Sequence, residues 1–460
     1  MNLSDRTHAL WPGTMRDASP NTQDTIFALS SAPGHAGVAV FRVSGPRSDR
    51  VLQELTDSPL PLPREARTRI LSVNGINIDQ ALVLRFPGPA SFTGEDVVEI
   101  MTHGSPAVVE HLAEAFLSIG IRQAAPGEFT RRAFLNGRMD LMEAEGLADL
   151  IDSETEAQRA QALRQMQGGL SKLASAWKES ILDALAQVEG EIDFPDEEDV
   201  PDKLSQSAGP TLDGLISQLQ SALSEASRGE RVRSGLRVAV IGAPNAGKSS
   251  LINYLVGREA AIVSSIPGTT RDVVEVQLDI AGLPVTVADT AGLRTSDDEI
   301  EQEGIRRARI NAGEADLRVL VVDATDPRPD GQDELRPSDF VLWNKTDTTD
   351  AGPPTLQNVH LFPVSVSRRE GLDDFIEKLE VEVSARYSPT RSPGLTRARH
   401  RDTVTRARDA LVRARANLDR APELAGDDLR SALFSIEELA GRADMEAVLD
   451  RVFSRFCIGK

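Results

Sequence analysis

The sequence is poor in cysteine, contains no long apolar run and has no excess of positive charge. Its one cysteine, Cys457, is fourth from the end, so no internal disulfide can form and a reducing, cytoplasmic location is expected. No stretch of about 18 consecutive apolar residues is present, which argues against a helix that spans a membrane. The net charge of -20 argues against a protein that holds nucleic acid mainly by neutralising phosphates, so any RNA contact must be local, transient or shared with a partner.

The chain has 460 residues, enough for about three domains of about 150 residues each. Residues 1–23 lack the apolar core of a signal peptide, and we expect a disordered leader there. Residues 24–137 combine strand-like apolar stretches with Gly/Pro turns, which predicts an α/β domain. Helical periodicity follows over 138–234 and again over 385–460. Because 235–384 alternates strand and helix patterns, the most economical layout inserts an α/β domain into a helical domain.

A glycine-rich loop, GAPNAGKS over 242–249, follows the first strand pattern of the inserted domain and precedes an apolar helix pattern. Backbone N–H groups of such a loop, together with the N-terminus of the helix, bind phosphate. Lys248 is expected to reach the β- and γ-phosphates, and Ser249 is expected to bind Mg²⁺. The loop therefore predicts a P-loop nucleotide-binding domain.

Three shorter motifs follow at the ends of later strand patterns. They are DTAG (289–292), NKTD (344–347) and SVS (365–367). Asp289 can bind Mg²⁺ through water, and the N–H of Gly292 can contact the γ-phosphate. The Asp347 carboxylate can accept both edge N–H groups of guanine, whereas adenine lacks that donor pair and would leave a buried charge unpaired. Backbone N–H groups of 365–367 can contact guanine O6, so the nucleotide is predicted to be GTP.

The segment between the P-loop and DTAG contains GTTRD over 268–272, where a switch loop belongs. Thr270 is the candidate second Mg²⁺ ligand there, and an ordinary Gly/Thr loop is the alternative. The residue after DTAG is Leu293, whereas Ras-like enzymes place a water-orienting Gln at that point. Another polar group and another positive charge are therefore needed. The acidic stretch downstream offers candidates, or is a solvated surface: Arg294, Asp297, Asp298, Glu299, Glu301 and Glu303.

The combination of GAPNAGKSSL, GTTRD, DTAGLR, NKTD and a terminal CIGK resembles the bacterial tRNA-modification GTPase family, also called the MnmE or TrmE family. The segments DTIFALSSAPGHAGVAVFRVSGP, SFTGEDVVEIMTHG, APGEFTRRAFLNGRMDLMEAEGLADLI and EIDFPDEED extend the resemblance over nearly the whole chain. It implies a multidomain α/β and all-α fold. An N-terminal domain like a tetrahydrofolate-binding module forms a homodimer, and a helical domain carries an inserted Ras-like P-loop GTPase domain.

The resemblance also implies a reaction and partners. An FAD-dependent protein of the MnmG/GidA type would join the homodimer in a heterotetramer. Together they would install a carboxymethylaminomethyl group at C5 of the tRNA wobble uridine, U34. A 5,10-methylene- or 5-formyl-tetrahydrofolate derivative is linked to the one-carbon chemistry, and its implied contacts are Arg42, Glu99, Arg138 and Lys460. Arg138 stands where Lys is common in the family.

The motifs and the resemblance together define an expected GTP site. Its residues are Asn245, Ala246, Gly247, Lys248, Ser249, Ser250, Ser264, Ser265, Ile266, Pro267, Gly268, Thr269, Thr270, Asp289, Thr290, Ala291, Gly292, Asn344, Lys345, Asp347, Ser365, Val366 and Ser367. Lys248, Asn245 and Glu301 are the expected catalytic residues. Glu301 is included because it aligns with the water-organising glutamate of the family. Ser249 and Thr270 are the expected Mg²⁺ ligands.

The resemblance further implies a K⁺ ion in the position of an arginine finger. Asn245, Thr269 and backbone carbonyls near Ser264 and Ile266 would hold it, and a cation there neutralises charge that develops in the transition state. It would also promote dimerisation of the GTPase domains. The alternative for Asn245 is an amide that stabilises its loop. Cys457 lies where the family places a nucleophile for uridine C6, and a structural role is its alternative.

Two further alternatives stay open. The Arg-rich stretch after Leu395 either contacts tRNA or forms a salt-bridged surface with the acidic residues among its arginines. The whole chain is either a GTPase that drives tRNA modification or a ribosome-assembly GTPase of the Era-like class. The Era-like class predicts a basic RNA-binding appendage, which does not fit this acidic chain.

Overall fold

The protein is described by a computed structural model with two compact units. The structure describes residues 24–193, 204–258, 275–289, 312–327, 331–387, 394–441, 446–454, 456 and 459. Unit 1 comprises Met1–Ala144 and Asp444–Lys460, and unit 2 comprises Glu145–Ala443. The end of the chain therefore belongs to the same unit as its beginning. The expected leader, residues 1–23, lies outside the described residues, and the expected domain boundaries stay predictions.

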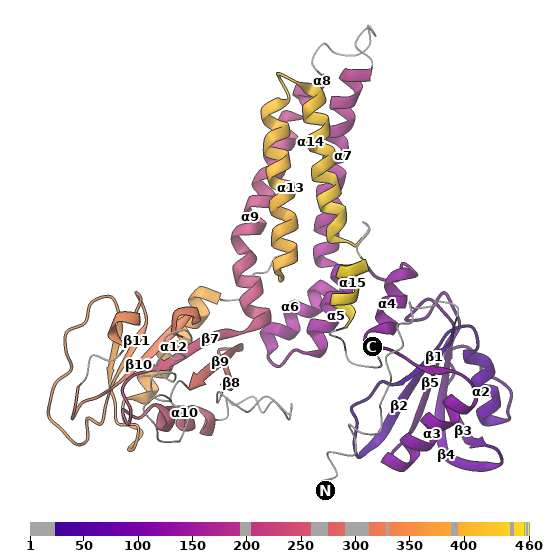
Figure 1. Ribbon diagram of the computed structural model, residues 1–460, viewed down its shortest axis with the longest axis horizontal. Coiled ribbons are helices and arrows are strands. Elements are labelled where there is room, and N and C mark those ends of the chain that lie inside the picture. Colours follow the sequence, from indigo (N-terminus) through magenta and orange to yellow (C-terminus); the bar gives the residue numbers. More distant parts are fainter. Residues whose placement is uncertain are drawn as a thin grey trace. The chain divides into compact units, whose positions relative to one another are not determined.

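Unit 1 is built on a six-stranded sheet of order β3-β4-β5-β2-β1-β6, in which only the β1–β6 pair is parallel. Its elements are β1 (Ile26–Leu29), β2 (Ala36–Ser44), α2 (Ser48–Thr56), β3 (Arg67–Val73), β4 (Ile76–Phe86), β5 (Val97–Gly104), α3 (Pro106–Ser118), β6 (Arg122–Gln123), α4 (Glu128–Leu135) and α15 (Glu446–Phe453) (Figure 1).

Alternation along β2 gives this sheet two different faces. Phe41 points to the face that α2 and α3 cover, where its ring centroid lies 5.6 Å from that of Phe116. Arg42 points to the other face. The register of β2 against β5 places Arg42 directly opposite Glu99, so two of the expected folate contacts are cross-strand neighbours.

Unit 2 contains a bundle of four long helices, α7 (Gly169–Asp193), α9 (Gly209–Ser234), α13 (Ala398–Asn417) and α14 (Pro422–Leu439) (Figure 1). The shorter helices α5 (Leu141–Ile151) and α6 (Glu156–Met166) precede them in the chain, and α8 (Leu204–Ser207) lies between α7 and α9 in sequence. Trp177, Leu212 and Leu411 are among the side chains fully buried between the long helices. Lys178 pairs with Glu437 and the later α7 residue Glu189 pairs with the earlier α14 residue Arg430, so α7 and α14 run antiparallel.

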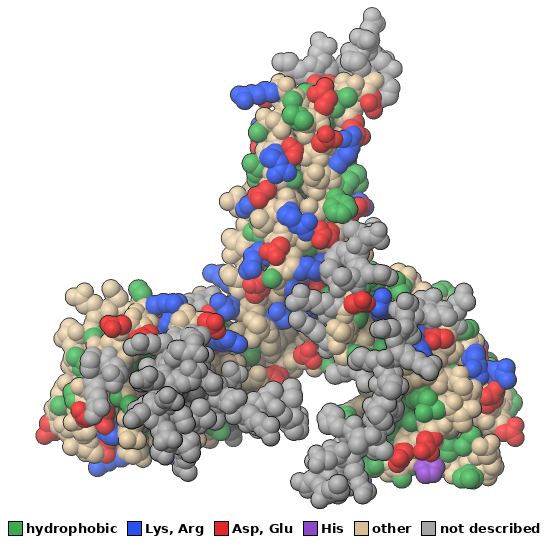
Figure 2. Space-filling view, viewed as in Figure 1, with side chains coloured by type: hydrophobic (Ala, Val, Ile, Leu, Met, Phe, Trp, Pro, Cys, Tyr) green, Lys and Arg blue, Asp and Glu red, His purple; other side chains and the backbone are tan. Residues whose placement is uncertain are grey.

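The arginines of α13 and the residue before it are all paired with carboxylates. The pairs are Arg397–Asp149, Arg399–Glu145, Arg401–Glu230, Arg406–Glu438, Arg408–Asp409, Arg413–Asp428 and Arg415–Asp213. Blue and red side chains alternate along the bundle in Figure 2. This arrangement favours the salt-bridged surface over a tRNA contact for the Arg-rich stretch.

The inserted domain of unit 2 has a second six-stranded sheet, of order β12-β11-β10-β7-β9-β8, parallel except for β8. Its elements are β7 (Leu236–Ile241), α10 (Lys248–Gly257), β8 (Glu275–Ile280), β9 (Leu283–Asp289), β10 (Leu317–Asp323), η1 (Gln332–Glu334), β11 (Phe340–Asn344), β12 (His360–Pro363) and α12 (Leu372–Tyr387). Strands β7, β10 and β11 are buried on both faces, which is why they read as continuous apolar runs. In the described part of the chain, no helix is both long and apolar enough to cross a membrane.

The chain leaves the helical bundle and returns to it at neighbouring points. Arg233, at the end of α9, donates from Nε to the Thr396 carbonyl at 2.9 Å, and Thr396 lies just before α13. Gln158 of α6 donates to the Arg233 carbonyl at 3.1 Å. The Thr396 hydroxyl donates to Gln165 Oε1 at 2.9 Å. Both crossings are thus tied to each other and to α6.

A buried ion cluster lies beside these crossings. His400 is fully buried and its Nε2 bonds to Glu145 Oε2 at 2.7 Å, while the Thr396 N–H donates to His400 Nδ1 at 3.4 Å. Burial lowers the pKa of His400 below its usual value despite the neighbouring carboxylate. Burial would raise the pKa of Glu145, but His400 and Arg399 hold it well below its usual range. A neutral imidazole therefore donates to an ionised carboxylate.

Candidate nucleotide and ligand sites

The glycine-rich loop of the inserted domain joins β7 to α10. Gly242 and Gly247 have φ values of 134° and 110°, which favour glycine. A Cβ on Gly242 would lie 2.2 Å from the Val321 carbonyl oxygen, and one on Gly247 would lie 2.2 Å from Nδ2 of Asn344. These contacts explain why the loop needs glycine at both positions.

The Lys248 side chain lies over this loop. It is buried, and its Nζ donates to the carbonyl oxygens of Gly242 and Ala243, both at 2.8 Å. Its ammonium is therefore held against the backbone that is expected to wrap phosphate. Asn245, an exposed residue of the same loop, has a left-handed φ of 61°, which asparagine tolerates better than most residues.

Asn344 connects the glycine-rich loop with the loop that follows β12. Its Nδ2 donates to the Ala246 carbonyl at 2.8 Å, and its Oδ1 accepts from the Val366 N–H at 3.0 Å. The residue is 3% exposed. The first residue of NKTD is therefore a buried bridge that fixes the distance between the predicted phosphate and guanine contacts.

The Asp347 carboxylate is oriented by two neighbours. Its Oδ1 accepts from the Ser365 hydroxyl at 2.7 Å, and its Oδ2 lies 3.4 Å from Nε of Arg368. The Ser365 hydrogen bond, with a smaller contribution from Arg368, lowers the pKa of Asp347. The carboxylate is thus ionised at neutral pH, as acceptance of two guanine N–H groups requires. Ser367 adjoins it through a hydroxyl contact with Ser365 at 3.1 Å.

Lys345 adopts a φ of 66° and its ammonium pairs with Asp323 at the end of β10. Partial burial would raise the pKa of Asp323, but bonds from Lys345 and Thr325 lower it below its usual value. This pair fixes the aliphatic stem of Lys345 beside the expected base pocket. The structure thus brings together the described residues of the glycine-rich loop, NKTD and SVS at the carboxyl end of one parallel sheet.

The residues at the start of α10 provide a suitable oxygen ligand for Mg²⁺. Ser249 is the second residue of the helix and is exposed, so its hydroxyl oxygen, a hard ligand, stands beside the phosphate-binding backbone. The other expected Mg²⁺ contacts lie outside what is described. Thr270 is one of them, and of Asp289 only the backbone is described, as the last residue of β9.

Several further expected site residues also lie outside the described part of the chain. They are Ser264, Ser265, Ile266, Pro267, Gly268, Thr269, Thr290, Ala291, Gly292, Glu301, Cys457 and Lys460.

The second candidate site lies on the face of the unit 1 sheet opposite α2 and α3, where Arg42 and Glu99 are largely buried. Arg42 donates from Nε and Nη2 to Glu99 Oε1 at 3.0 and 2.8 Å. Its guanidinium lies 4.9 Å from the ring centroid of Phe92 and 5.8 Å from that of Phe129. A cation, a carboxylate and the partly exposed Phe92 ring therefore meet at one place, which suits a flat heterocycle with N–H donors, whereas the Phe129 ring is fully buried.

Of the other two expected folate contacts, Arg138 is described, whereas Lys460 lies outside the described residues. A Cβ on Gly94 would be 3.3 Å from Cγ of Arg138, so the Arg138 side chain packs on the loop that carries Phe92. Near the end of the chain, Gly459 contacts the residue that follows β1, because the Ser30 hydroxyl donates to the Gly459 carbonyl at 3.1 Å. Gly459 precedes Lys460, and β1 pairs with β2 next to Arg42.

Sequence reasoning missed several residues that shape these sites. Arg368 and the hydroxyl of Ser365 orient Asp347, and Asp323 holds Lys345. The strand-end position of Asp323 was the only available signal. Around the second site, Phe92 and Phe129 were missed because aromatic side chains in apolar patterns read as core residues.

The parallel sheet, the glycine-rich loop and the Asp347 carboxylate of NKTD define the class of the protein, a P-loop GTPase that uses GTP and Mg²⁺. Comparison with known proteins narrows this class. The TrmE N-terminus family ("GTP-binding protein TrmE N-terminus") matches residues 25–138, and the MnmE helical domain family matches residues 141–457. The chain belongs to the MnmE family of tRNA modification GTPases.

Relatives from several bacteria support this membership. The chain is 48% identical over 439 residues to the tRNA modification GTPase MnmE of Maricaulis maris, covering 95% of this chain and 99% of that one. It is 47% identical to the MnmE of Hyphomonas neptunium and 48% identical to that of Caulobacter vibrioides, each over 95% of this chain. Membership favours tRNA modification over the Era-like alternative.

Solved structures also show similarity. The G domain of the FeoB iron transporter of T. maritima is 23% identical, with a TM-score of 0.24, covering 32% of this chain and 98% of that one. The cytosolic domain of the same transporter in a GDP form is 18% identical, with a TM-score of 0.26, covering 45% of this chain and 98% of that one.

Proposed function

We propose that the protein is a K⁺-stimulated GTPase that modifies tRNA with an FAD-dependent partner of the MnmG/GidA type. The pair would add a carboxymethylaminomethyl group at C5 of the wobble uridine, U34. The observation that carries this proposal is 48% identity over 95% of the chain to a protein named tRNA modification GTPase MnmE. The Arg42–Glu99 pair in unit 1 supports a second ligand site in addition to the GTP site.

Within the GTP site, each described residue has a role in holding or polarising the nucleotide. The glycine-rich loop binds phosphate oxygens through its N–H groups, and Lys248 turns its ammonium from the loop carbonyls toward the β- and γ-phosphates. Asp347 accepts from the guanine edge. Ser249 and Thr270 would hold Mg²⁺, which neutralises charge on the phosphate oxygens when bound.

In this proposal, two groups supply the water orientation and the positive charge that are needed because no Gln follows DTAG. Glu301 orients the attacking water. Asn245, Thr269 and carbonyls near Ser264 and Ile266 hold K⁺, which supplies positive charge where an arginine finger would act. Asn245 is exposed and has a left-handed φ, which supports this role because its side chain is accessible to an ion.

Unit 1 would bind the one-carbon donor, a 5,10-methylene- or 5-formyl-tetrahydrofolate derivative. Glu99 can accept from N–H donors of the pteridine ring, and the partly exposed Phe92 ring beside Arg42 can stack on it. Arg138 and Lys460 would pair with the negative charges of the ligand. Cys457, which lies outside the described residues, would belong to the same site in this proposal. The active assembly would be a heterotetramer, in which a homodimer joined through unit 1 binds the FAD protein.

The biological assignment is tested by nucleoside analysis of tRNA from cells that lack the protein. The expected result is an unmodified wobble uridine that returns when the gene is restored. An unchanged modification profile in the deleted strain would reject the proposal.

The ion dependence is tested by GTP hydrolysis in K⁺ and in Na⁺ at equal ionic strength. Hydrolysis should be faster in K⁺, and Asn245→Ala should remove the difference. Asn358→Ala is the matched control, because Asn358 has a similar left-handed φ of 62° in a loop of the same domain. Equal rates in the two salts for the unaltered protein would count against K⁺ stimulation.

A further inference from the structure

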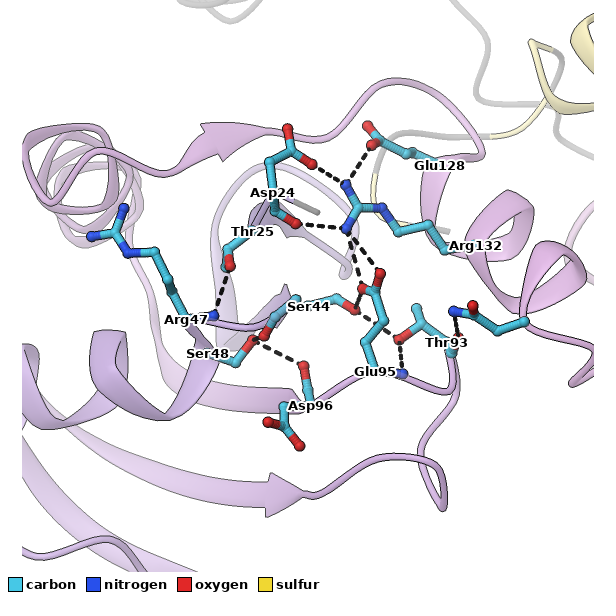
Figure 3. Close-up of polar contacts among 12 residues, drawn as sticks. Asp24, Thr25, Ser44, Arg47, Ser48, Thr93, Glu95, Asp96, Glu128 and Arg132 are labelled. Carbon is cyan, nitrogen blue, oxygen red and sulfur yellow. Dashed lines mark hydrogen bonds and ion pairs between the residues drawn. The ribbon is translucent and has the colours of Figure 1, made fainter. Parts of the chain in front are cut away.

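A buried arginine that neither the motifs nor the resemblance single out lies at the centre of the polar network in unit 1 (Figure 3). Arg132 of α4 is 1% exposed. Its Nη2 donates to Asp24 Oδ1 at 2.5 Å and to Glu128 Oε1 at 3.0 Å. Its Nη1 donates to the Asp24 carbonyl at 2.8 Å and reaches both oxygens of Glu95 at 3.2 Å. One planar fork thus joins three separate chain segments.

The contact with Glu95 reaches the loop over residues 91–96. In that loop the Thr93 and Glu95 side chains are also tied to β2, because the Ser44 hydroxyl lies 2.7 Å from both Thr93 Oγ1 and Glu95 Oε2. Asn136, just after α4, donates to the Thr93 carbonyl at 2.7 Å. The loop is therefore held from the α4 side by Arg132 and Asn136 and from the sheet side by Ser44.

The same loop contacts two of the expected folate residues. Phe92 presents its ring 4.9 Å from the Arg42 guanidinium, which is bound to Glu99. Gly94, with a φ of 80°, packs against the stem of Arg138. A shift of the loop would change the positions of Phe92 and Gly94 together, and hence the spacing between Arg42 and Arg138.

We propose that Arg132 is a positioning residue for the reduced-folate site of unit 1. By holding Glu95, Arg132 fixes the position of the 91–96 loop in which Phe92, Arg42 and Arg138 can contact one ligand. This inference rests on the proposed folate function. Arg132 itself does not touch the ligand, because it is buried beneath the loop.

The network also offers a matched control. Arg122 pairs with the same two carboxylates, with Nε 2.6 Å from Asp24 Oδ2 and Nη2 2.6 Å from Glu128 Oε1. Its described bonds go to those carboxylates and to the Gln123 carbonyl, and none goes to Glu95. Loss of Arg122 therefore removes a comparable part of the charge network without releasing the loop.

The experiment measures binding of 5-formyltetrahydrofolate to the full-length protein by calorimetry. Arg132→Lys keeps the positive charge, but a lysine ammonium cannot reach three carboxylates at once. The Kd of this variant for 5-formyltetrahydrofolate should therefore rise about tenfold or more, equivalent to about 1.4 kcal/mol. Glu95→Gln should have a similar effect. If Arg132 acts through Glu95, the double variant should be at most about threefold weaker than either single variant. Arg122→Gln should stay within about threefold of the unaltered protein even where its Tm falls.

Several outcomes would overturn the inference. Unchanged affinity in Arg132→Lys, an equal loss in Arg122→Gln, or fully additive effects of Arg132→Lys and Glu95→Gln would each do so. If Arg132→Lys does not fold, Ser44→Ala provides a milder release of the loop. It should weaken binding, and full affinity in that variant would refute the idea. Failure of the unaltered protein to bind the probe would instead overturn the proposed folate function.

Discussion

Removal of the Asn344 side chain should disconnect the phosphate and guanine parts of the GTP site. In Asn344→Ala, the Ala246 carbonyl and the Val366 N–H each lose their partner inside the protein. A buried polar group left without a partner costs about 1–3 kcal/mol. The inserted domain should therefore lose about 2–6 kcal/mol of its free energy of unfolding if both groups stay buried.

The effect on GTP follows from the same two hydrogen bonds. If about 1.4 kcal/mol of the loss comes from the nucleotide-binding conformation, the Kd for GTP rises about tenfold. Binding of a fluorescent GTP analogue, with denaturant unfolding of the same sample, measures both quantities. Asn344→Asp is an informative companion. It keeps the acceptor for Val366 but places an oxygen against the Ala246 carbonyl, which is 2.8 Å from Nδ2 in the native residue. A Kd within about twofold of the unaltered value in Asn344→Ala would refute this account of the bridge.

Three further predictions concern other parts of the structure. Gly247→Ala should abolish tight GTP binding, because its Cβ would lie 2.2 Å from Asn344 Nδ2 at a φ of 110°; Gly257→Ala, whose Cβ meets nothing within 4 Å, should bind normally. Arg318→Met should destabilise the inserted domain by about 3–5 kcal/mol in denaturant unfolding, because Asp339 would stay buried without its cation, and it should cost far more than loss of the exposed Arg237. The lowered pKa of His400 means that its contribution to stability is present above about pH 6.5, the unfolded value, and is lost on acidification, since the unfolded chain then takes up a proton that the folded protein does not. Tm should therefore fall more between about pH 7.5 and about pH 5.5, one unit either side of the unfolded pKa, for the unaltered protein than for His400→Gln. An equal fall in Tm for the two proteins would contradict the lowered pKa of His400.

The GTP site was predictable because its chemistry is carried by short local motifs. GAPNAGKS needs a strand, a loop with two positive-φ glycines and a helix start, and all three are found between β7 and α10. The order of the sheet brings NKTD and SVS to the same edge, as strand-end motifs in a parallel sheet require. The multidomain α/β and all-α fold was predicted correctly, because periodicity changes clearly near Leu236.

The residues that orient the motif side chains were not predictable in the same way. The SVS motif predicts a role only for the backbone of Ser365, yet its hydroxyl orients Asp347 from 18 positions away. Arg132 contacts Asp24 over a separation of 108 positions, and no spacing rule connects an α4 residue with the segment before β1. Such contacts depend on tertiary packing, so a single sequence carries no local signal for them.

The closeness of the two chain crossings in unit 2 has a use in protein engineering. Because Arg233 bonds to the Thr396 carbonyl at 2.9 Å, the helical scaffold already has its ends side by side where the GTPase domain departs. A short flexible linker could replace the excised segment without stretching α9 or α13. By the same geometry, another compact domain with adjacent termini could be inserted at this point, so the bundle can serve as a scaffold for different inserted domains.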